Sequence, residues 1–472
     1  MSIDVASLTL ADVSDLVGKR QVSPVELVRS YIERIEKYDH AIHAFIRVTA
    51  DVAMDRARAA EQEIMAGKRR GPMHGVPYGL KDIVETKGIP TTAHSRVLRD
   101  HVPQADAVVE AKLAQAGGIL LGKLGCLEFA HASPTPDQGW PQVRNPWNTD
   151  HGFTGGSSTG SGAAVAASFV PAAVGTDTGG SVRNPAALCG IAGIMPTYGR
   201  VSRRGVIPYS FSLDHVGPLA WTARDCAIML NAMAGYDADD PGSADQAVPD
   251  FTASLRGDLR GVRIGLLRHF HEEDMQADAD TLAAMNETIR LLGDLGAQVV
   301  DVRARPLLDY HDCKLIISVA EFYSVHEQEF AAKFQDYGAD LQTKTFQGAF
   351  LSAADYLQAQ RARRRLALEM QETMAPFDVL LTASNFRPAP KIQTKPRDST
   401  EFFQKPNITA VFNVTGNPAI CINNGFSHDG LPLSCQIVGK YFEEAKVLRV
   451  ADALERATSW SKKRPVLREC AS

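Results

Sequence analysis

The sequence is short of cysteine and has no long hydrophobic run, and each absence excludes a class of protein. The seven cysteines in 472 residues are odd in number and form no C-x-x-C pair, which argues against a disulfide framework and a zinc site. The most apolar stretch, residues 163–175, contains Ser168 and Pro171 and is shorter than the roughly 20 residues a membrane span needs. The N-terminus is acidic and does not resemble a secretory signal. We therefore expect a cytoplasmic protein with free thiols and no membrane partner.

The sequence also lacks a strong charge of either sign. Fifty Lys and Arg residues stand against 55 Asp and Glu residues, for a formal net charge of −5. This balance argues against electrostatic binding of nucleic acid by the chain as a whole, so no nucleic-acid partner is expected. Hydrophobic residues make up 44% of the chain, which is enough for a substantial core.

Helical and strand patterns alternate along most of the chain. Ser23, Pro24 and Glu26 form a capping box that starts an amphipathic helix. Two β-α-β units are expected. The first has strands at residues 76–81 and 119–123 with a helix at 107–115 between them. The second has strands at residues 261–267 and 298–302 with a helix at 278–293 between them. The alternation predicts an α/β fold with a parallel sheet as its scaffold.

The pattern shows no internal repeat and no clear domain boundary. We expect one domain over residues 1–472, with an N-terminal helical segment at residues 1–66. Residues 236–254 are rich in Asp and Pro and are expected to form a surface excursion. Longer helices are expected around residues 313–334 and 352–374, and short strands at 379–381, 419–422 and 433–438.

Three segments have compositions that packing alone does not explain. Residues 154–162, T-G-G-S-S-T-G-S-G, precede a run of small apolar residues, and converging N–H groups at a helix start suit an anion or oxyanion. Residues 175–183 end a short apolar strand with two glycines and Ser181, which places a hydroxyl beside successive N–H groups. Residues 79–82 place Lys81 at the end of an apolar strand, where burial would turn its amine into a base. Because none of the three contains histidine, they favour a Ser/Lys scheme for acyl transfer.

A competing motif is present in the first segment. Gly156 to Gly160 matches G-x-S-x-G, the nucleophile elbow of α/β-hydrolases, which would make Ser158 the nucleophile of an esterase. The elbow needs a strand directly before it, and residues 148–153 are a poor strand. It also needs a late histidine, for which His428 is the main candidate. The elbow is kept as an alternative.

The motifs together resemble the amidase signature family. The resemblance is carried by G-L-K-D around Lys81, by residues 155–158, by residues 175–183, and by residues 196–202, 212–218 and 413–419, so it spans nearly the whole chain. The resemblance implies the family's fold, a large mixed, mostly parallel, twisted β-sheet sandwiched by α-helices, and an amidase activity without cofactor or metal. Thr159 and Gly162 depart from the usual Gly and Ala of the family's Gly/Ser loop.

Carried over by position, the resemblance assigns roles to individual residues. Ser181 would be the nucleophile that forms an acyl-enzyme, Ser157, with a cis peptide bond, would relay protons, and Lys81 would be the base. The N–H groups of Thr178, Gly179, Gly180 and Ser181 would form the oxyanion hole. Ser158, Asp177 and Arg183 are expected to support the site.

Two activities fit the resemblance. The general pattern is similar to the glutamine-hydrolysing subunit of the glutamine-dependent tRNA amidotransferase, and Arg363 matches the arginine with which that protein binds the glutamine carboxylate. The region that supplies its acidic residue aligns near Pro406 and Asn407, neither of which is acidic. We therefore favour a hydrolase of small amides, anilides or carbamates. The glutamine-hydrolysing component of an amidotransferase, and a catalytically silent binding protein, are kept as alternatives.

Aromatic segments hint at an apolar or aryl substrate, and a homodimer is possible. The candidate pocket residues are His131, Ser133, Tyr209, Phe211, Phe322, Phe386 and Arg387.

Overall fold

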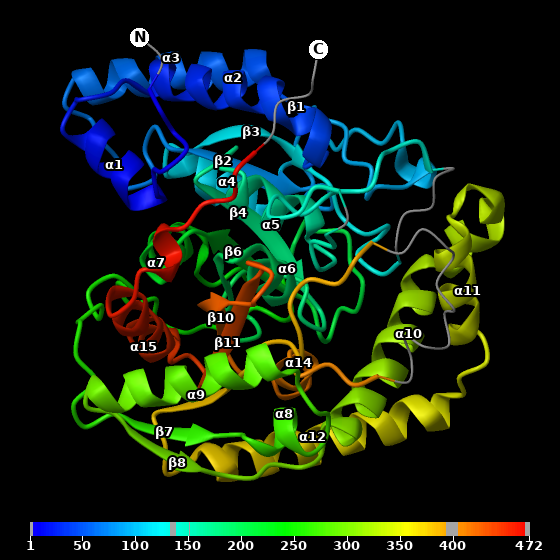
Figure 1. The fold of residues 1–472 in the computed structure, drawn as a ribbon. Coiled ribbons are helices and arrows are strands. Elements are labelled where there is room, and N and C mark those ends of the chain that lie inside the picture. The colour runs from blue at the N-terminus through cyan, green and yellow to red at the C-terminus, as the bar shows by residue number, and fades with distance from the viewer. Residues whose placement is uncertain (1–2, 133–137, 151, 393–404, 468–472) are drawn as a thin grey trace.

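The computed structural model describes residues 3–132, 138–150, 152–392 and 405–467. One eleven-stranded sheet runs through the middle of the molecule, with helices around it (Figure 1). In spatial order its strands are β1-β3-β2-β4-β6-β5-β10-β11-β9-β7-β8. Their bounds are β1 Phe45–Val48, β2 Pro77–Lys81, β3 Ile119–Leu124, β4 Ala172–Asp177, β5 Ala192–Met195, β6 His215–Ala220, β7 Arg263–Leu266, β8 Gln298–Asp301, β9 Val379–Ala383, β10 Ala419–Phe426 and β11 Pro432–Gly439.

The large mixed sheet confirms the predicted fold class, but the expectation that it is mostly parallel is wrong. Pairs β2–β3, β2–β4, β7–β8 and β7–β9 are parallel, whereas the six other described pairs are antiparallel. The cause is the centre of the sheet. There β6 inserts antiparallel between β4 and β5, and β10 and β11 form a hairpin whose two strands pair with β5 and β9. The β-α-β rhythm in the sequence does not reveal an inserted strand.

Helices cover the sheet on both faces. Helices α5 and α6 pack together, and α6 lies against β5, β10 and β11, whereas α7 and α15 pack together beside β6, β10 and β11. Helices α10, α12 and α14 pack against one another, with α10 on the right and α12 along the bottom in Figure 1. The helix bounds are α1 Leu10–Gly18, α2 Pro24–Ile42, α3 Ala50–Met65, α4 Val108–Gln115, α5 Thr159–Ala166, α6 Arg183–Cys189, α7 Ala223–Met233, α8 His269–Glu272, α9 Ala279–Asp294, α10 Leu307–Ala332, α11 Ala339–Gly348, α12 Ala353–Met374, α14 Ala410–Thr415 and α15 Glu444–Arg456.

Local signals in the sequence locate several of these helices. The capping box of α2 is present, because the Ser23 hydroxyl accepts from the Glu26 N–H and the Glu26 carboxylate accepts from the Ser23 N–H, both at 3.0 Å. Helix α12 begins after an equivalent box at Ser352 and Asp355. Such caps satisfy backbone groups that a helix end leaves unpaired.

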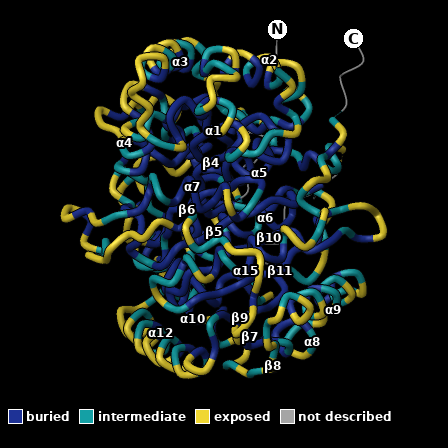
Figure 2. The backbone as a smooth tube through the Cα atoms, turned by 90° about the vertical axis from the view of Figure 1, so that its left-hand side faces the viewer, coloured by how far each residue is buried: buried dark blue, intermediate teal, exposed yellow. Residues whose placement is uncertain are grey.

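The core lies along the sheet and beneath its helices, and the exposed backbone lies at the periphery (Figure 2). A second, smaller apolar cluster contains Phe129, Tyr209, Phe322, Phe330 and Tyr337. Among the described residues, no helix combines the length and apolar character required to cross a membrane.

The two segments singled out from the sequence behave differently. The N-terminal 66 residues contain α1, α2 and α3, but also β1, which joins the edge of the sheet through β3. Residues 236–254 contain no helix or strand, and the carboxylates of Asp237 and Asp240 hold them against Arg204 and Arg203. The single-domain assignment stays a prediction.

Candidate active site

Lys81 is the last residue of β2, and its side chain is fully buried. Its Nζ donates to the hydroxyls of Ser157 and Thr176, each at 2.7 Å. Burial lowers the pKa of Lys81 from 10.5 to about 8, against the opposing influence of Cys126 and two nearby carboxylates. A lysine amine with this pKa is partly neutral near pH 8, so it can accept a proton from Ser157.

Ser157 connects Lys81 to the loop before α5. The Gly156–Ser157 peptide bond is cis, as the resemblance predicts. The Ser157 carbonyl accepts from the Leu127 N–H at 2.9 Å, and the next residue, Ser158, donates its N–H to the Ser181 carbonyl at 3.2 Å. The two serine-containing segments, 24 positions apart in the sequence, are therefore in direct backbone contact.

The turn that carries Ser181 joins β4 to α6 and is built around the Asp177 carboxylate. This carboxylate accepts from the backbone N–H groups of Gly180, Val182 and Arg183, at 2.7, 3.1 and 3.3 Å. Ser181 itself is only half-buried. A single buried carboxylate thus fixes the backbone on both sides of Ser181 while leaving Ser181 partly accessible.

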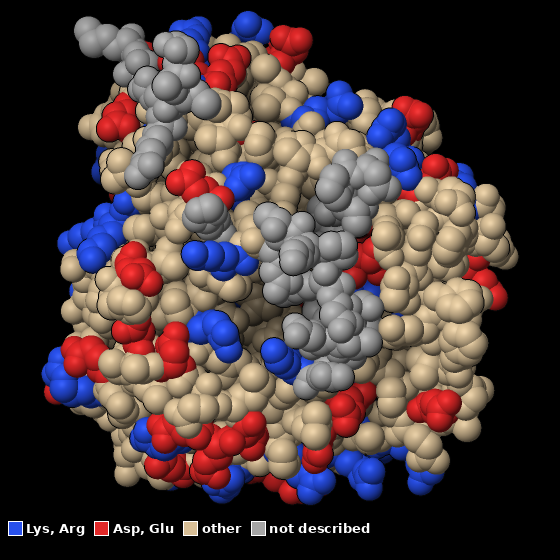
Figure 3. Space-filling view, turned by 45° about the vertical axis from the view of Figure 1, so that its right-hand side comes forward, with Lys and Arg blue, Asp and Glu red and all other residues tan. Residues whose placement is uncertain are grey.

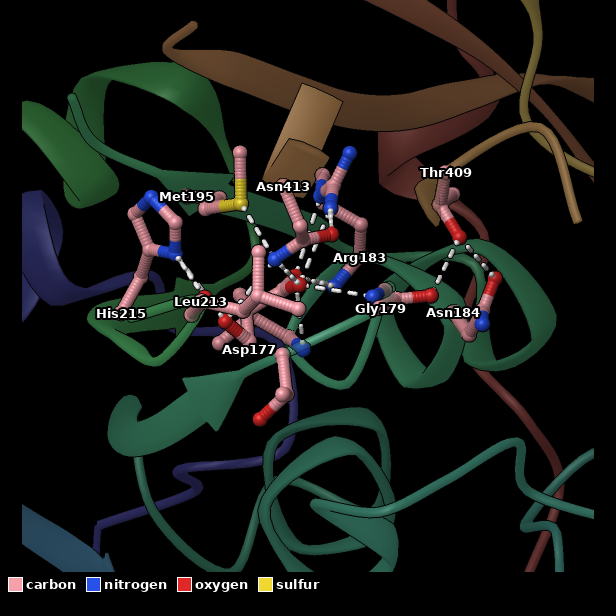
Figure 4. Close-up of polar contacts among 12 residues, drawn as sticks. Asp177, Gly179, Arg183, Asn184, Met195, Leu213, His215, Thr409 and Asn413 are labelled. Atoms are coloured by element: carbon pink, nitrogen blue, oxygen red, sulfur yellow. Dashed lines mark hydrogen bonds and ion pairs between the residues drawn. The ribbon is translucent and has the colours of Figure 1, made fainter. Parts of the chain in front are cut away.

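The negative charge of the Asp177 carboxylate is balanced by a buried guanidinium and a hydrogen bond from an amide (Figure 4). The Arg183 guanidinium contacts both Asp177 oxygens at 2.9 and 3.0 Å, and Asn413 Nδ2 donates to the same carboxylate at 2.9 Å. Burial alone would raise the pKa of Asp177, but Arg183 and Asn413 hold it well below its usual range. Asp177 therefore stays ionised, and Arg183 links it to Gln436 on β11. Both residues lie where site support was expected, within the turn.

The backbone N–H groups expected to form the oxyanion hole divide into two kinds. The Gly180 N–H donates to Asp177, so the expectation that it faces an oxyanion is wrong for the geometry of this turn. The N–H groups of Thr178, Gly179 and Ser181 donate to no group within the described ranges. Gly180 has a φ of +119°, and a side chain there would collide with the Thr409 hydroxyl. Gly180 is thus required for the shape of the turn.

The Gly179 carbonyl is held from the other side of the turn (Figure 4). It accepts from the Thr409 hydroxyl and from Asn407 Nδ2, both at 3.1 Å. Because a peptide is planar, fixing this carbonyl also fixes the Gly180 N–H that faces Asp177. Residues just before α14 therefore help to fix the turn that carries Ser181.

Ser158 does not have the geometry of a nucleophile elbow. It is fully buried, and its hydroxyl hydrogen-bonds the backbone of Thr176 on β4 at 3.3 Å. No strand precedes it within residues 138–150 and 152–157. His428 is exposed and pairs with Asp280 at 2.7 Å, on a hairpin turn after β10. Ser158 instead holds its loop against β4.

Three of the candidate pocket residues form one cluster, and a fourth, Phe211, lines the same cavity as Tyr209. The rings of His131, Tyr209 and Phe322 form a buried cluster, with centroids 4.5 to 5.6 Å apart. Burial, together with Lys344 and Lys314, keeps the pKa of His131 well below its usual value. Phe386 packs against the main core cluster, and Arg387 is exposed. Ser133 lies outside the described residues.

A cavity of about 510 Å³ adjoins this region. Its lining includes Thr176, which holds Lys81, together with Tyr209, Phe211 and Asp214. The segment from Asp239 to Gly242, part of the expected surface excursion, forms another wall. Figure 3 shows a hollow on one face of the molecule with Lys and Arg side chains near its edge.

Sequence reasoning missed several residues that hold the site. Thr176 binds Lys81, and its place in β4, directly beside β2, was the available signal. Thr409 and Asn413 hold the turn from α14 or just before it, more than 200 residues away in the chain. Lys314 of α10, whose side chain lies against Gly179 of the turn, was also missed. Cys126 and Cys189 are buried, and burial raises the pKa of each thiol, which agrees with a packing role.

Comparisons with known proteins match this architecture. The Amidase family matches residues 26–448. The A subunit of glutamyl-tRNA(Gln) amidotransferase from Chloroflexus aurantiacus is 38% identical, with 98% of each chain covered. Among solved structures, the peptide amidase from Stenotrophomonas maltophilia is 29% identical with a TM-score of 0.85, covering 98% of this chain and 99% of that one. The corresponding amidotransferase protein from Thermotoga maritima is 30% identical with a TM-score of 0.82, with both chains fully covered.

The fold and these similarities define a hydrolase that acts on amide C–N bonds. The chain belongs to the Amidase family, whose match covers most of its length.

Proposed function

We propose that the chain hydrolyses small amides, anilides or carbamates, with Ser181 as nucleophile, Ser157 as proton relay and Lys81 as base. The observation that carries the proposal is the 2.7 Å contact between the buried Lys81 amine and the Ser157 hydroxyl. Burial lowers the pKa of this amine to about 8, so its neutral form, which can accept a proton, is available near that pH. Direct backbone contact between Ser158 and Ser181 supports the relay, because it brings the two loops together.

The proposed reaction has two halves. Ser181 Oγ attacks the carbonyl carbon while its proton passes to Ser157, and the Ser157 proton passes to Lys81. The C–N bond then breaks as the relay returns a proton to the departing nitrogen, which leaves an ester on Ser181. Water hydrolyses this ester through the same relay. Free N–H groups of the turn, at Thr178, Gly179 and Ser181, supply donors for the oxyanion within the described part of the chain.

Aromatic packing beside the site supports an aryl or other apolar group on the substrate. Tyr209 and Phe211 line the cavity that reaches Thr176, and Tyr209 also contacts the buried rings of His131 and Phe322. Aromatic surfaces of this kind favour planar apolar groups.

Glutamine hydrolysis within an amidotransferase complex is the second candidate, favoured by the curated relatives. Two side chains argue against free glutamine. Arg363 donates to the carbonyls of Val414 and Ser212, at 3.0 and 2.9 Å, so its guanidinium is engaged by backbone. Asn407 binds the Gly179 carbonyl and carries no charge for an ammonium group.

The test is a comparison of kcat/KM for p-nitroacetanilide and glutamine, with Ser181→Ala as the control for background hydrolysis. We expect the anilide to exceed glutamine at least tenfold, and both activities to vanish in Ser181→Ala. A higher kcat/KM for glutamine would contradict the proposal and favour glutamine hydrolysis within an amidotransferase complex. Activity that persists in Ser181→Ala would show that Ser181 is not the nucleophile.

A further inference from the structure

We propose that Lys314 of α10 is a specificity residue that binds a carboxylate on the acyl part of the substrate, so that half-amides of short dicarboxylic acids are preferred. This inference rests on the proposed function and names the substrate class of the same site. The resemblance assigns Lys314 no role.

Lys314 lies directly against the nucleophile turn. A Cβ placed on Gly179 would be 3.0 Å from Lys314 Cε and 3.5 Å from its Nζ. Gly179 is two residues before Ser181 and has an N–H group that faces no described partner. The ammonium group therefore lies beside the backbone that would hold the reacting carbonyl.

The charge of Lys314 is not matched by a protein carboxylate within the described residues. Its hydrogen bond is to the Tyr209 hydroxyl at 3.3 Å, and its Nζ lies 5.3 Å from the centre of the same ring. No ion pair within 4.0 Å is found for it in the described part of the chain. Lys314 is half-buried, and an ammonium has three donors, so it retains donors for an anion.

The neighbouring carboxylates are already engaged. Asp214 accepts from the Thr178 hydroxyl at 2.5 Å and from the N–H groups of Tyr209 and Ser210. Glu321, seven residues further along α10, accepts from the Ser210 hydroxyl at 2.6 Å and the Tyr356 hydroxyl at 2.7 Å. Each carboxylate thus stabilises a loop or helix of the site.

The neighbouring cations are directed at other groups. Arg363 donates its Nε and one Nη to the backbone carbonyls of Val414 and Ser212, and Lys344 pairs with Asp340 at 3.0 Å. Lys314 is therefore the cation beside the turn best placed to meet a charged substrate group. A partly desolvated ammonium gains most from a fully charged acceptor.

The position of Lys314 limits the length of the substrate. Gly179 and Ser181 are two residues apart, so their Cα atoms are separated by at most about 7 Å. Because Lys314 Nζ also lies 3.5 Å from the Cβ position of Gly179, we infer that a short chain joins a carbonyl at Ser181 to a carboxylate at Lys314. Succinamate, with two methylene groups between its amide and its carboxylate, has this length.

The experiment compares two amides of four carbon atoms, succinamate and butyramide, which differ by a carboxylate in place of a methyl group. Ammonia release gives kcat/KM for each with the full-length chain, and the readout is their ratio. Wild type is expected to favour succinamate. In Lys314→Met the ratio should fall by about tenfold to a hundredfold, and Lys314→Arg should retain a preference for succinamate.

The controls separate recognition from structural damage. Lys333, just beyond α10, is exposed and pairs with Glu329, so Lys333→Met is expected to keep both the ratio and the rates. A merely structural role of Lys314 would lower both substrates together and leave the ratio unchanged, which would overturn the inference. A wild-type ratio at or below one would overturn it too. Labelling of Ser181 by a fluorophosphonate without cleavage of either amide would overturn the substrate class alone. If Ser181 is not labelled and neither amide is cleaved, the proposed function is overturned as well.

Discussion

Lys81 and Ser157 illustrate how a single buried contact determines chemistry at the scale of one residue. The end of β2 removes the amine from water, and the hydroxyls of Ser157 and Thr176 are its hydrogen-bond partners. The sequence could predict the position of Lys81 at the end of an apolar strand, but its burial was only a condition of the proposed chemistry, and the structure supplies it. The sequence could not predict Thr176 as a partner, because that contact depends on β4 pairing with β2.

The pH dependence of activity follows from the lowered pKa of Lys81. The neutral amine is the active form, so kcat/KM should rise about tenfold per pH unit below pH 8 and level off above it. The measurement is a pH profile from 6 to 10 on an uncharged amide. A Lys81→Arg variant, which keeps its proton over this range, should show no rise and little activity. A wild-type profile that is flat through pH 8 would contradict the role of Lys81.

At the scale of elements, the connection from β4 to α6 depends on contacts from distant parts of the chain. Asp177 and Arg183 lie within the motif, so a supporting role was predictable from the sequence. Asn413, Thr409 and Gln436, which complete the network, come from elements far along the chain and carry no local signal. The error at Gly180 has a different cause, because its N–H donates to Asp177 three residues earlier, and this contact depends on the shape of the turn.

The stability of this connection can be tested at Arg183. Replacing it with Met leaves the ionised Asp177 buried without its cation, which should cost about 3–5 kcal/mol in the free energy of unfolding. Urea unfolding followed by circular dichroism measures the change. The double variant Asp177→Asn with Arg183→Met should recover part of the loss.

The control is Arg290→Met on the exposed face of α9, where the pair with Glu287 is in water and unfolding should be nearly unchanged. If Arg183→Met is as mild as this control, the Asp177 network does not hold the turn.

At the scale of the whole molecule, the sheet brings the two halves of the chain to one site. Strands β2 and β4 supply Lys81 and the turn of Ser181, while α10 and α14 bring Lys314 and Asn413 from the second half. The sequence predicts the α/β class and most helices, because periodicity and caps are local. It does not predict the antiparallel centre, where β6 inserts between β4 and β5, because strand order is set by packing across the molecule.

The most direct test of the account is covalent labelling by a fluorophosphonate, followed by intact mass and peptide mapping, in wild type, Lys81→Ala and the control Lys333→Ala. The account predicts one adduct on Ser181, formed at the same rate in Lys333→Ala and much more slowly in Lys81→Ala. An adduct on Ser158, or a rate at Ser181 that does not depend on Lys81, would contradict it.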